Sequence, residues 1–483
     1  MEKFTAWMEE HFVPIAARIG SQKHLVAIRD AFIAILPITM AGSFAVLFNA
    51  IVRDVMAENA LNLPQVTQAF QWLIAIDGNV WWGTIAMLAL VFSFAIGYQI
   101  AKAYGVTALA GGLISTSAFI IVTPQTANAS LTFADPTLVS QQALDMITES
   151  GGVVDAEAGT LSLGAWGNLN VSYLNAGGLF TALIVGLIFT IIFSKLMKSK
   201  LTITLPDSVP PAVSDAFRAL IPGTAVLFGA GILAYALGEL HTANAEIPGS
   251  LGDMITKFIQ TPFLNASQGL GWVILVTFMV ELFWFFGIHG SNVMAPVMSG
   301  VYLTALTSNM DAWATNQNYA DLPYQWTSGS WEAFVYLGGS GASIGLIIAI
   351  FIFSKRKEYR TIAALAAPMG VFEINEPMVF GLPIVLNPVF LIPWILVPPI
   401  LAVIAWLATM SGIVPPTIIQ LPWIAPPIIG AFIATGFQWT AAVLAAINLA
   451  ISVLIWSVFV IMANGMAEKE AAAEAQVEAA ATS

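Results

Sequence analysis

The chain has no cysteine and very few charged residues. None of its 483 residues is cysteine, which excludes disulfides, thiol chemistry and a phosphocysteine on this chain. Only 9% of the residues are charged and 58% are hydrophobic, and the mean hydropathy is +0.83. A soluble protein of this size would need more polar residues to face water. The composition therefore predicts a polytopic membrane protein that lies in the lipid bilayer.

Several functional motifs are also missing. The four histidines are too few and too scattered to suggest a metal site. The sequence has no glycine-rich phosphate loop ending in Lys-Ser/Thr, no GxSxG turn and no basic stripe. We therefore predict no metal, no cofactor and no nucleic-acid partner.

The apolar runs predict an all-α membrane protein with about ten transmembrane helices, because ~20 apolar residues are needed to span the hydrocarbon core. The N-terminal stretch is expected to form an amphipathic helix on the membrane surface, since Phe4, Trp7, Phe12, Ile15 and Ile19 recur at helical spacing. The expected spans are 28–52, 80–101, 106–122, 172–194, 220–240, 271–288, 292–306, 332–353, 384–409 and 437–462.

Two further stretches are apolar but too broken to be ordinary spans. Residues 362–383 contain two glutamates, an asparagine and prolines, and residues 411–433 contain five prolines. Irregular backbone is tolerated at membrane depth only where protein buries it or where it lines a water-filled cavity. Both stretches are therefore expected to form re-entrant hairpins.

The basic residues predict the orientation. Four of them occur in 195–218 and four in 355–360, whereas the segments 123–171 and 307–331 contain acids and no Lys or Arg. By the positive-inside rule, the basic loops and both termini of this multi-pass protein are cytoplasmic. Nearly all chemically interesting residues follow the basic loop at 195–218.

The same loop suggests a division of the chain. Residues 1–218 are expected to form an N-terminal scaffold, residues 219–465 a substrate-carrying domain, and residues 466–483 an acidic cytoplasmic tail.

Glu376 is the most informative position. This acid lies between long apolar runs and is followed by Pro377 and Gly381. A carboxylate at membrane depth costs about 2.5–3.5 kcal/mol on insertion scales, so it is a candidate functional group. Glu373 would share a helix face with Glu376, unless the backbone unwinds after Ile374. Glu373 could also face the cytoplasmic entrance.

His289 is the second candidate. It lies at the end of an apolar span, between Gly287 and Gly290, and polar residues follow it. A chain break near Gly287 would allow Trp284 to approach it. The alternative is a purely structural histidine.

These residue types suit a neutral polyol. Carboxylates accept strong bonds from adjacent hydroxyls, and pyranose faces stack on indole rings. Little positive charge is available for an anionic substrate, and no carboxylate cluster has the spacing of a metal site.

Two motifs also resemble a known family. INEPMVFGLPIVLNP (374–388) and WFFGIHG (284–290) match its two hallmarks, and segments at 16–43, 173–186 and 421–432 are similar as well. The chain resembles the membrane-spanning C component (permease) of bacterial sugar phosphotransferase systems, of the lactose/cellobiose/chitobiose family.

The resemblance implies a homodimer whose N-terminal domain forms the dimer interface and whose C-terminal domain carries the sugar. Glu376 and His289 would bind the sugar near the hydroxyl that becomes phosphorylated, either orienting or deprotonating it. Glu373 and the long segments 123–171 and 307–331 depart from the family pattern and leave the exact sugar open. Lesser contacts implied by the resemblance are Asn375, Trp284, Trp423 and Asn175.

We therefore predict a phosphotransferase-system permease for a neutral, β-linked disaccharide. A separate soluble B component would donate the phosphoryl group from its cysteine, so the chain would not be catalytic alone. The alternatives are a proton-coupled sugar symporter that uses Glu376 as the proton carrier, and a membrane-embedded enzyme or receptor-like binding protein.

Overall fold

The computed structural model describes residues 10–11, 14–15, 17–49, 51–52, 64–132, 140–149, 152–155, 160–206, 208–382, 384–385 and 387–482. Most of the predicted N-terminal amphipathic helix lies outside these residues. Ile15 and Ile19, which belong to that prediction, are 57% and 42% exposed. At the other end, the backbone of the acidic tail continues the last helix to Thr482.

The chain forms two compact units. One comprises Met1–Ile85 and Thr261–Ser483, and the other comprises Ala86–Gln260. The units do not follow the expected division at residue 218, because the first long helix belongs to the same unit as the C-terminal half. The roles of scaffold and carrier stay predictions.

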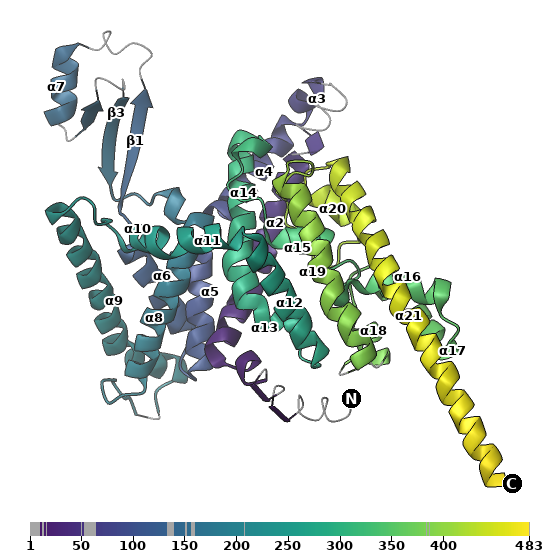
Figure 1. The fold of residues 1–483 in the computed structure, drawn as a ribbon. Coiled ribbons are helices and arrows are strands. Elements are labelled where there is room, and N and C mark those ends of the chain that lie inside the picture. Colours follow the sequence, from purple (N-terminus) through teal and green to yellow (C-terminus); the bar gives the residue numbers. More distant parts are fainter. Residues whose placement is uncertain are drawn as a thin grey trace. The chain divides into compact units, whose positions relative to one another are not determined.

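Every described secondary-structure element of the first unit is a helix, and its helices are interrupted repeatedly. Helices α12 and α19 lie side by side, as do α16 and α21 (Figure 1). Its elements are α2 (Lys23–Asn49), α3 (Pro64–Ala69), α4 (Gln71–Gly83), α11 (Thr261–Ser267), α12 (Leu270–Phe285), α13 (Gly290–Val297), the π-helical η7 (Met298–Leu303), α14 (Thr304–Asn316), η8 (Tyr319–Asp321), α15 (Ser328–Phe334), η9 (Ser340–Ala342), α16 (Ser343–Phe353), α17 (Lys357–Gly370), α18 (Glu376–Gly381), α19 (Pro388–Met410), α20 (Ile429–Ala434) and α21 (Trp439–Thr482).

Buried aromatic residues and interhelical hydrogen bonds hold this unit together. Trp394 and Trp456 are fully buried in its core. The Asn448 side-chain amide donates to the carbonyls of Phe334 (2.8 Å) and Leu401 (3.2 Å) and so ties α21 to α15 and α19. Such bonds satisfy polar groups that lipid cannot solvate.

The second unit combines packed helices with one small sheet. The chain enters it through the short turn η2 (Ile85–Met87). Gly97 of α5 lies so close to α6 that a Cβ built on it would be 2.2 Å from the Ser115 Cβ. Gly111 of α6 contributes to the same close packing, because its carbonyl oxygen lies 2.6 Å from the built Cβ. The elements are α5 (Leu88–Ala103), α6 (Ala108–Val122), β1 (Thr126–Thr132), α7 (Gln141–Glu149), β2 (Val153–Asp155), β3 (Thr160–Trp166), η4 (Val171–Tyr173), η5 (Ala176–Gly178), α8 (Leu179–Met197), α9 (Pro211–Ala243), α10 (Leu251–Ile255) and the π-helical η6 (Thr256–Gln260).

A small antiparallel sheet is the departure from the all-α prediction. Its strand order is β1-β3-β2, and Thr126 pairs with Trp166 at one end of the β1–β3 register (Figure 1). All three strands lie in the segment 123–171, which the sequence predicted only as a long loop. The all-α prediction is wrong for this segment alone, because every other described secondary-structure element is a helix.

Six described helices are long and apolar enough to cross a membrane. A seventh results if the bent pair Leu251–Ser267 and Leu270–Phe285 counts as one span, and Ala108–Val122 and Ser340–Phe353 are shorter apolar helices. The helical membrane fold is therefore confirmed, whereas the count of ten spans stays a prediction.

Both predicted hairpin segments have broken helices. In the first, α17 ends at Gly370 and α18 begins at Glu376. In the second, irregular backbone precedes α20, which begins at Ile429. Their re-entrant course in the membrane stays a prediction.

Candidate functional site

The GIHG motif forms a sharp break between α12 and α13. Gly287 has a φ of +73°, a left-handed conformation that glycine adopts without strain. A Cβ built on Gly290 would be only 1.9 Å from the Val280 oxygen, so glycine is required at this close approach. The break expected near Gly287 is confirmed.

This break brings His289 against Trp284. The ring centroids are 4.4 Å apart, and the ring planes are inclined at 42°. His289 is the N-cap of α13, and its Nδ1 accepts a hydrogen bond of 3.3 Å from the Asn292 backbone N–H. A neutral ring that accepts at Nδ1 carries its proton on Nε2. That N–H is then a donor for a ligand oxygen.

The NEP motif forms the second break. Glu373 has a φ of +62°, so the helix of α17 cannot continue through it. Asn375 is the N-cap of α18, and Glu376 is the first residue of that helix. Glu373 and Glu376 therefore do not share a helix face. The backbone is unwound at 371–375, which begins earlier in the chain than the unwinding after Ile374 considered from the sequence.

A glycine-rich turn supports the NEP motif. The Asn375 side-chain amide donates to the Ser340 carbonyl (3.4 Å), and Gly339 lies against the Asn375 side chain. The turn is held from the other side by Glu281, whose Oε1 accepts from the Gly341 N–H (3.1 Å). Glu281 is fully buried, and it orients this turn rather than facing the cavity.

One cavity of about 430 Å³ collects the sequence-predicted residues. Pockets of this size are typical of small-molecule sites. No lysine or arginine is among the described residues that line it. The predicted residues that line it are Trp284, His289, Asn375, Glu376 and Trp423.

Trp423 and Asn175 differ in their placement. Trp423 lines the cavity and is 56% exposed, so its ring face is available for stacking. Asn175 belongs to the other compact unit, where its side-chain oxygen accepts from the Gly177 N–H (2.9 Å) and caps η5. A sugar contact for Asn175 stays a prediction.

The sequence reasoning did not single out several residues that line this cavity. Glu332, at the start of the predicted span 332–353, is a membrane-depth acid and could have been noticed for the same reason as Glu376. Gln420 lies in the second predicted hairpin. Other polar and aromatic residues of this kind are Ser328, Trp331, Tyr336 and Ser340.

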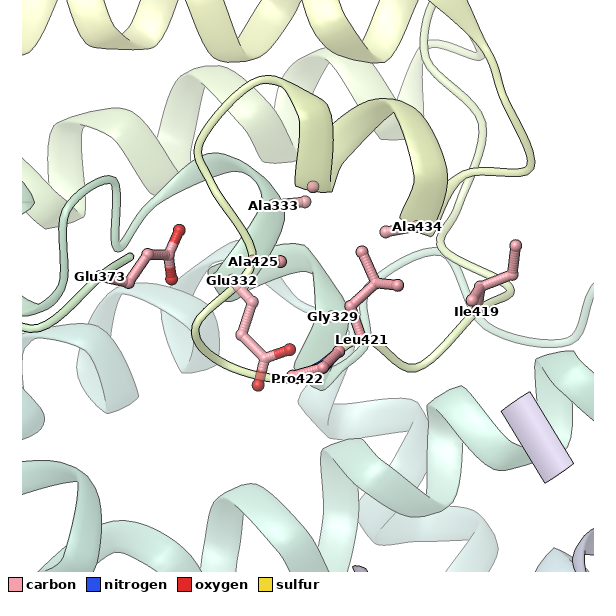
Figure 2. Close-up of a pocket in the computed structure, with 10 residues that line it drawn as sticks. Gly329, Glu332, Ala333, Glu373, Ile419, Leu421, Pro422, Ala425 and Ala434 are labelled. Carbon is pink, nitrogen blue, oxygen red and sulfur yellow. The ribbon is translucent and has the colours of Figure 1, made fainter. Parts of the chain in front are cut away.

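A small recess adjoins the cavity. Its volume is about 10 Å³, close to the space that one water molecule needs. Glu332 and Glu373 line both the recess and the cavity, and Figure 2 shows their side chains, from α15 and from the turn before α18. His289 and Glu376 line only the cavity.

Comparison with known proteins assigns the chain to a family. Residues 29–398 match the model of the phosphotransferase system EIIC family. The chain belongs to this family. It is therefore an integral membrane permease component of a phosphotransferase system, and the family predicted from the two motifs is confirmed.

Relatives of this EIIC protein match it over nearly the whole chain. The cellobiose-specific EIIC component of Lactococcus lactis is 40% identical, covering 97% of this chain and 100% of the relative. The lichenan permease IIC component of Bacillus subtilis is 31% identical, covering 95% and 93%. The crystal structure of the transporter ChbC, the IIC component from the N,N'-diacetylchitobiose-specific phosphotransferase system, matches with a TM-score of 0.82 and 27% identity, covering 96% of this chain and 99% of that one.

Proposed function

We propose that this EIIC protein takes up a neutral β-linked disaccharide of the cellobiose type. The observation that carries the proposal is the cavity in which Glu376, His289 and the exposed Trp423 meet and which no described lysine or arginine lines. The Glu376 carboxylate accepts hydrogen bonds from sugar hydroxyls, and the His289 Nε2–H donates one. The names of the relatives, which include cellobiose and lichenan, support this class of sugar.

The chain presents the bound sugar to a soluble B component, because it has no cysteine of its own. A sugar hydroxyl oxygen attacks the phosphorus of that partner's phosphocysteine. The O–P bond forms, the S–P bond breaks, and the hydroxyl proton leaves to a base. The Glu376 carboxylate either accepts this proton or orients the hydroxyl, and His289, whose Nε2 already carries a proton, orients it by donating a hydrogen bond.

Phosphorylation makes uptake one-way. The product carries negative charge, which the Glu376 carboxylate repels, so the phosphorylated sugar leaves to the cytoplasm.

The carrier part moves as a body between outward and inward states within a homodimer. Both termini are cytoplasmic.

The test is uptake of labelled cellobiose into vesicles that contain the purified chain. We expect accumulation to require the B component and a phosphoryl donor derived from phosphoenolpyruvate, and to yield sugar phosphate. Accumulation of unmodified sugar driven by a proton gradient would contradict the proposal and favour the symporter.

A further inference from the structure

The cavity contains a second pair of acids besides the proposed Glu376–His289 centre. Glu373 is only 7% exposed, yet it lines both the cavity and the recess. Within the described chain, neither Glu373 nor Glu332 accepts a side-chain hydrogen bond or forms an ion pair. A buried carboxylate without a partner is costly, so a native fold keeps one where a ligand or water completes its bonds.

The position of this pair separates it from the proposed reaction centre. The recess lined by Glu373 and Glu332 is completed by other residues of α15 and by the segment 419–434, including Leu421 and Pro422 (Figure 2). Neither His289 nor Glu376 reaches the recess. The cavity therefore offers hydroxyl acceptors in two regions, as a ligand with two sugar rings requires.

The backbone conformation of Glu373 also indicates that this residue belongs to a ligand site. Its φ of +62° is unfavourable for a residue with a side chain. Residues in such conformations cost about 1–3 kcal/mol and are concentrated at ligand clamps. Here the turn directs a carboxylate into the cavity from outside the helix that carries Glu376.

We infer that Glu373 and Glu332 bind the sugar ring that is not phosphorylated, by accepting hydrogen bonds from its hydroxyls. The pair thereby makes the site selective for a disaccharide over a single ring. This inference rests on the proposed function, because it assumes that Glu376 and His289 hold the first ring.

The test compares two ligands of the full-length protein in detergent. Competition against labelled cellobiose measures the affinity of unlabelled cellobiose and of methyl β-D-glucoside, which has one ring. We expect Glu373→Gln and Glu332→Gln to weaken cellobiose binding by about tenfold each and to change methyl β-D-glucoside binding by less than about twofold. Glu376→Gln weakens both ligands.

Three controls keep the result interpretable. Glu358→Gln removes an exposed acid that pairs with Arg356 outside the cavity, and its affinities stay at the wild-type level. Glu373→Asn removes the carboxylate with a residue that tolerates a positive φ. Thermal unfolding of each variant reports whether it folds, and Glu332→Gln provides a test that does not touch the strained turn.

The outcomes distinguish the two proposals. Unchanged cellobiose affinity in folded Glu373→Gln and Glu332→Gln overturns the inference, and so does an equal loss for both ligands. If wild-type protein binds neither sugar, the proposed function itself fails.

Discussion

The two compact units meet the cost of polar groups in the membrane differently. In both units, buried hydroxyls bond to helix backbone, as Ser115 does to the Ser93 carbonyl of the neighbouring helix in the second unit (2.6 Å) and Thr277 does to the Val273 carbonyl in the first (2.7 Å). In the first unit, side chains distant in sequence also satisfy backbone groups left unpaired where helices break, as Glu281 does for Gly341. A continuous helix satisfies its backbone hydrogen bonds internally, whereas a broken helix needs hydrogen bonds from a network of other segments. Among the described residues, Glu332 and Glu373 take no part in this network, and both line the cavity.

Removing the Glu376 charge should have the largest effect, because this acid lies at a helix break that lines the cavity of the first unit. We expect Glu376→Gln to reduce sugar uptake by about 100-fold, because a charged acceptor is worth about 1.5–3 kcal/mol per hydrogen bond. Vesicle uptake measures the effect, and membrane insertion is expected to stay normal. Normal uptake would remove Glu376 from the site.

A methyl group at the break of the first unit should disrupt fold and site together. In Gly290→Ala the Cβ would lie 1.9 Å from the Val280 oxygen, and we expect a loss of about 2–3 kcal/mol in stability. Sugar binding should fall as well, because His289 is the preceding residue. The melting temperature in detergent and calorimetric sugar binding measure the two effects. Gly229→Ala is the matched control, since its Cβ meets nothing within 4 Å.

The same change in the second unit should affect stability alone. Gly97→Ala places a Cβ 2.2 Å from the Ser115 Cβ, and we expect a loss of about 1–3 kcal/mol. The sugar affinity of the folded fraction should stay at the wild-type value in calorimetry. A large loss of sugar affinity in Gly97→Ala would contradict the prediction that this change in the second unit affects stability alone.

Truncating the histidine should have the smallest of these effects. His289→Ala removes one donor to the sugar and the ring that packs on Trp284. We expect affinity to fall by about tenfold, which corresponds to one lost hydrogen bond. Calorimetry checks this prediction, and an unchanged dissociation constant would show that His289 does not contact the sugar.

The sequence predicted the centre of the site because its signals were local. An acid among prolines at 374–388 and a histidine between glycines at 284–290 each mark a helix break within one short segment. The structure has both breaks and brings Glu376, His289, Trp284, Asn375 and Trp423 to one cavity.

Other features depended on contacts between distant segments. The acids Glu332 and Glu373 are 41 positions apart, and only the packing of α15, the segment 419–434 and the turn before α18 places both at one recess. The sheet at 126–166 was missed because its strands lie in a segment that the charge pattern described only as an acidic loop. The first helix, α2, joins the C-terminal half through packing that no local pattern reveals.

The sequence by itself determined the membrane class and the two breaks, since hydropathy, proline and glycine act on the nearest residues. The tertiary structure decided which acids remain without a protein partner and face the cavity. Desolvation and hydrogen bonding depend on every segment that surrounds a group, and those segments come from across the chain.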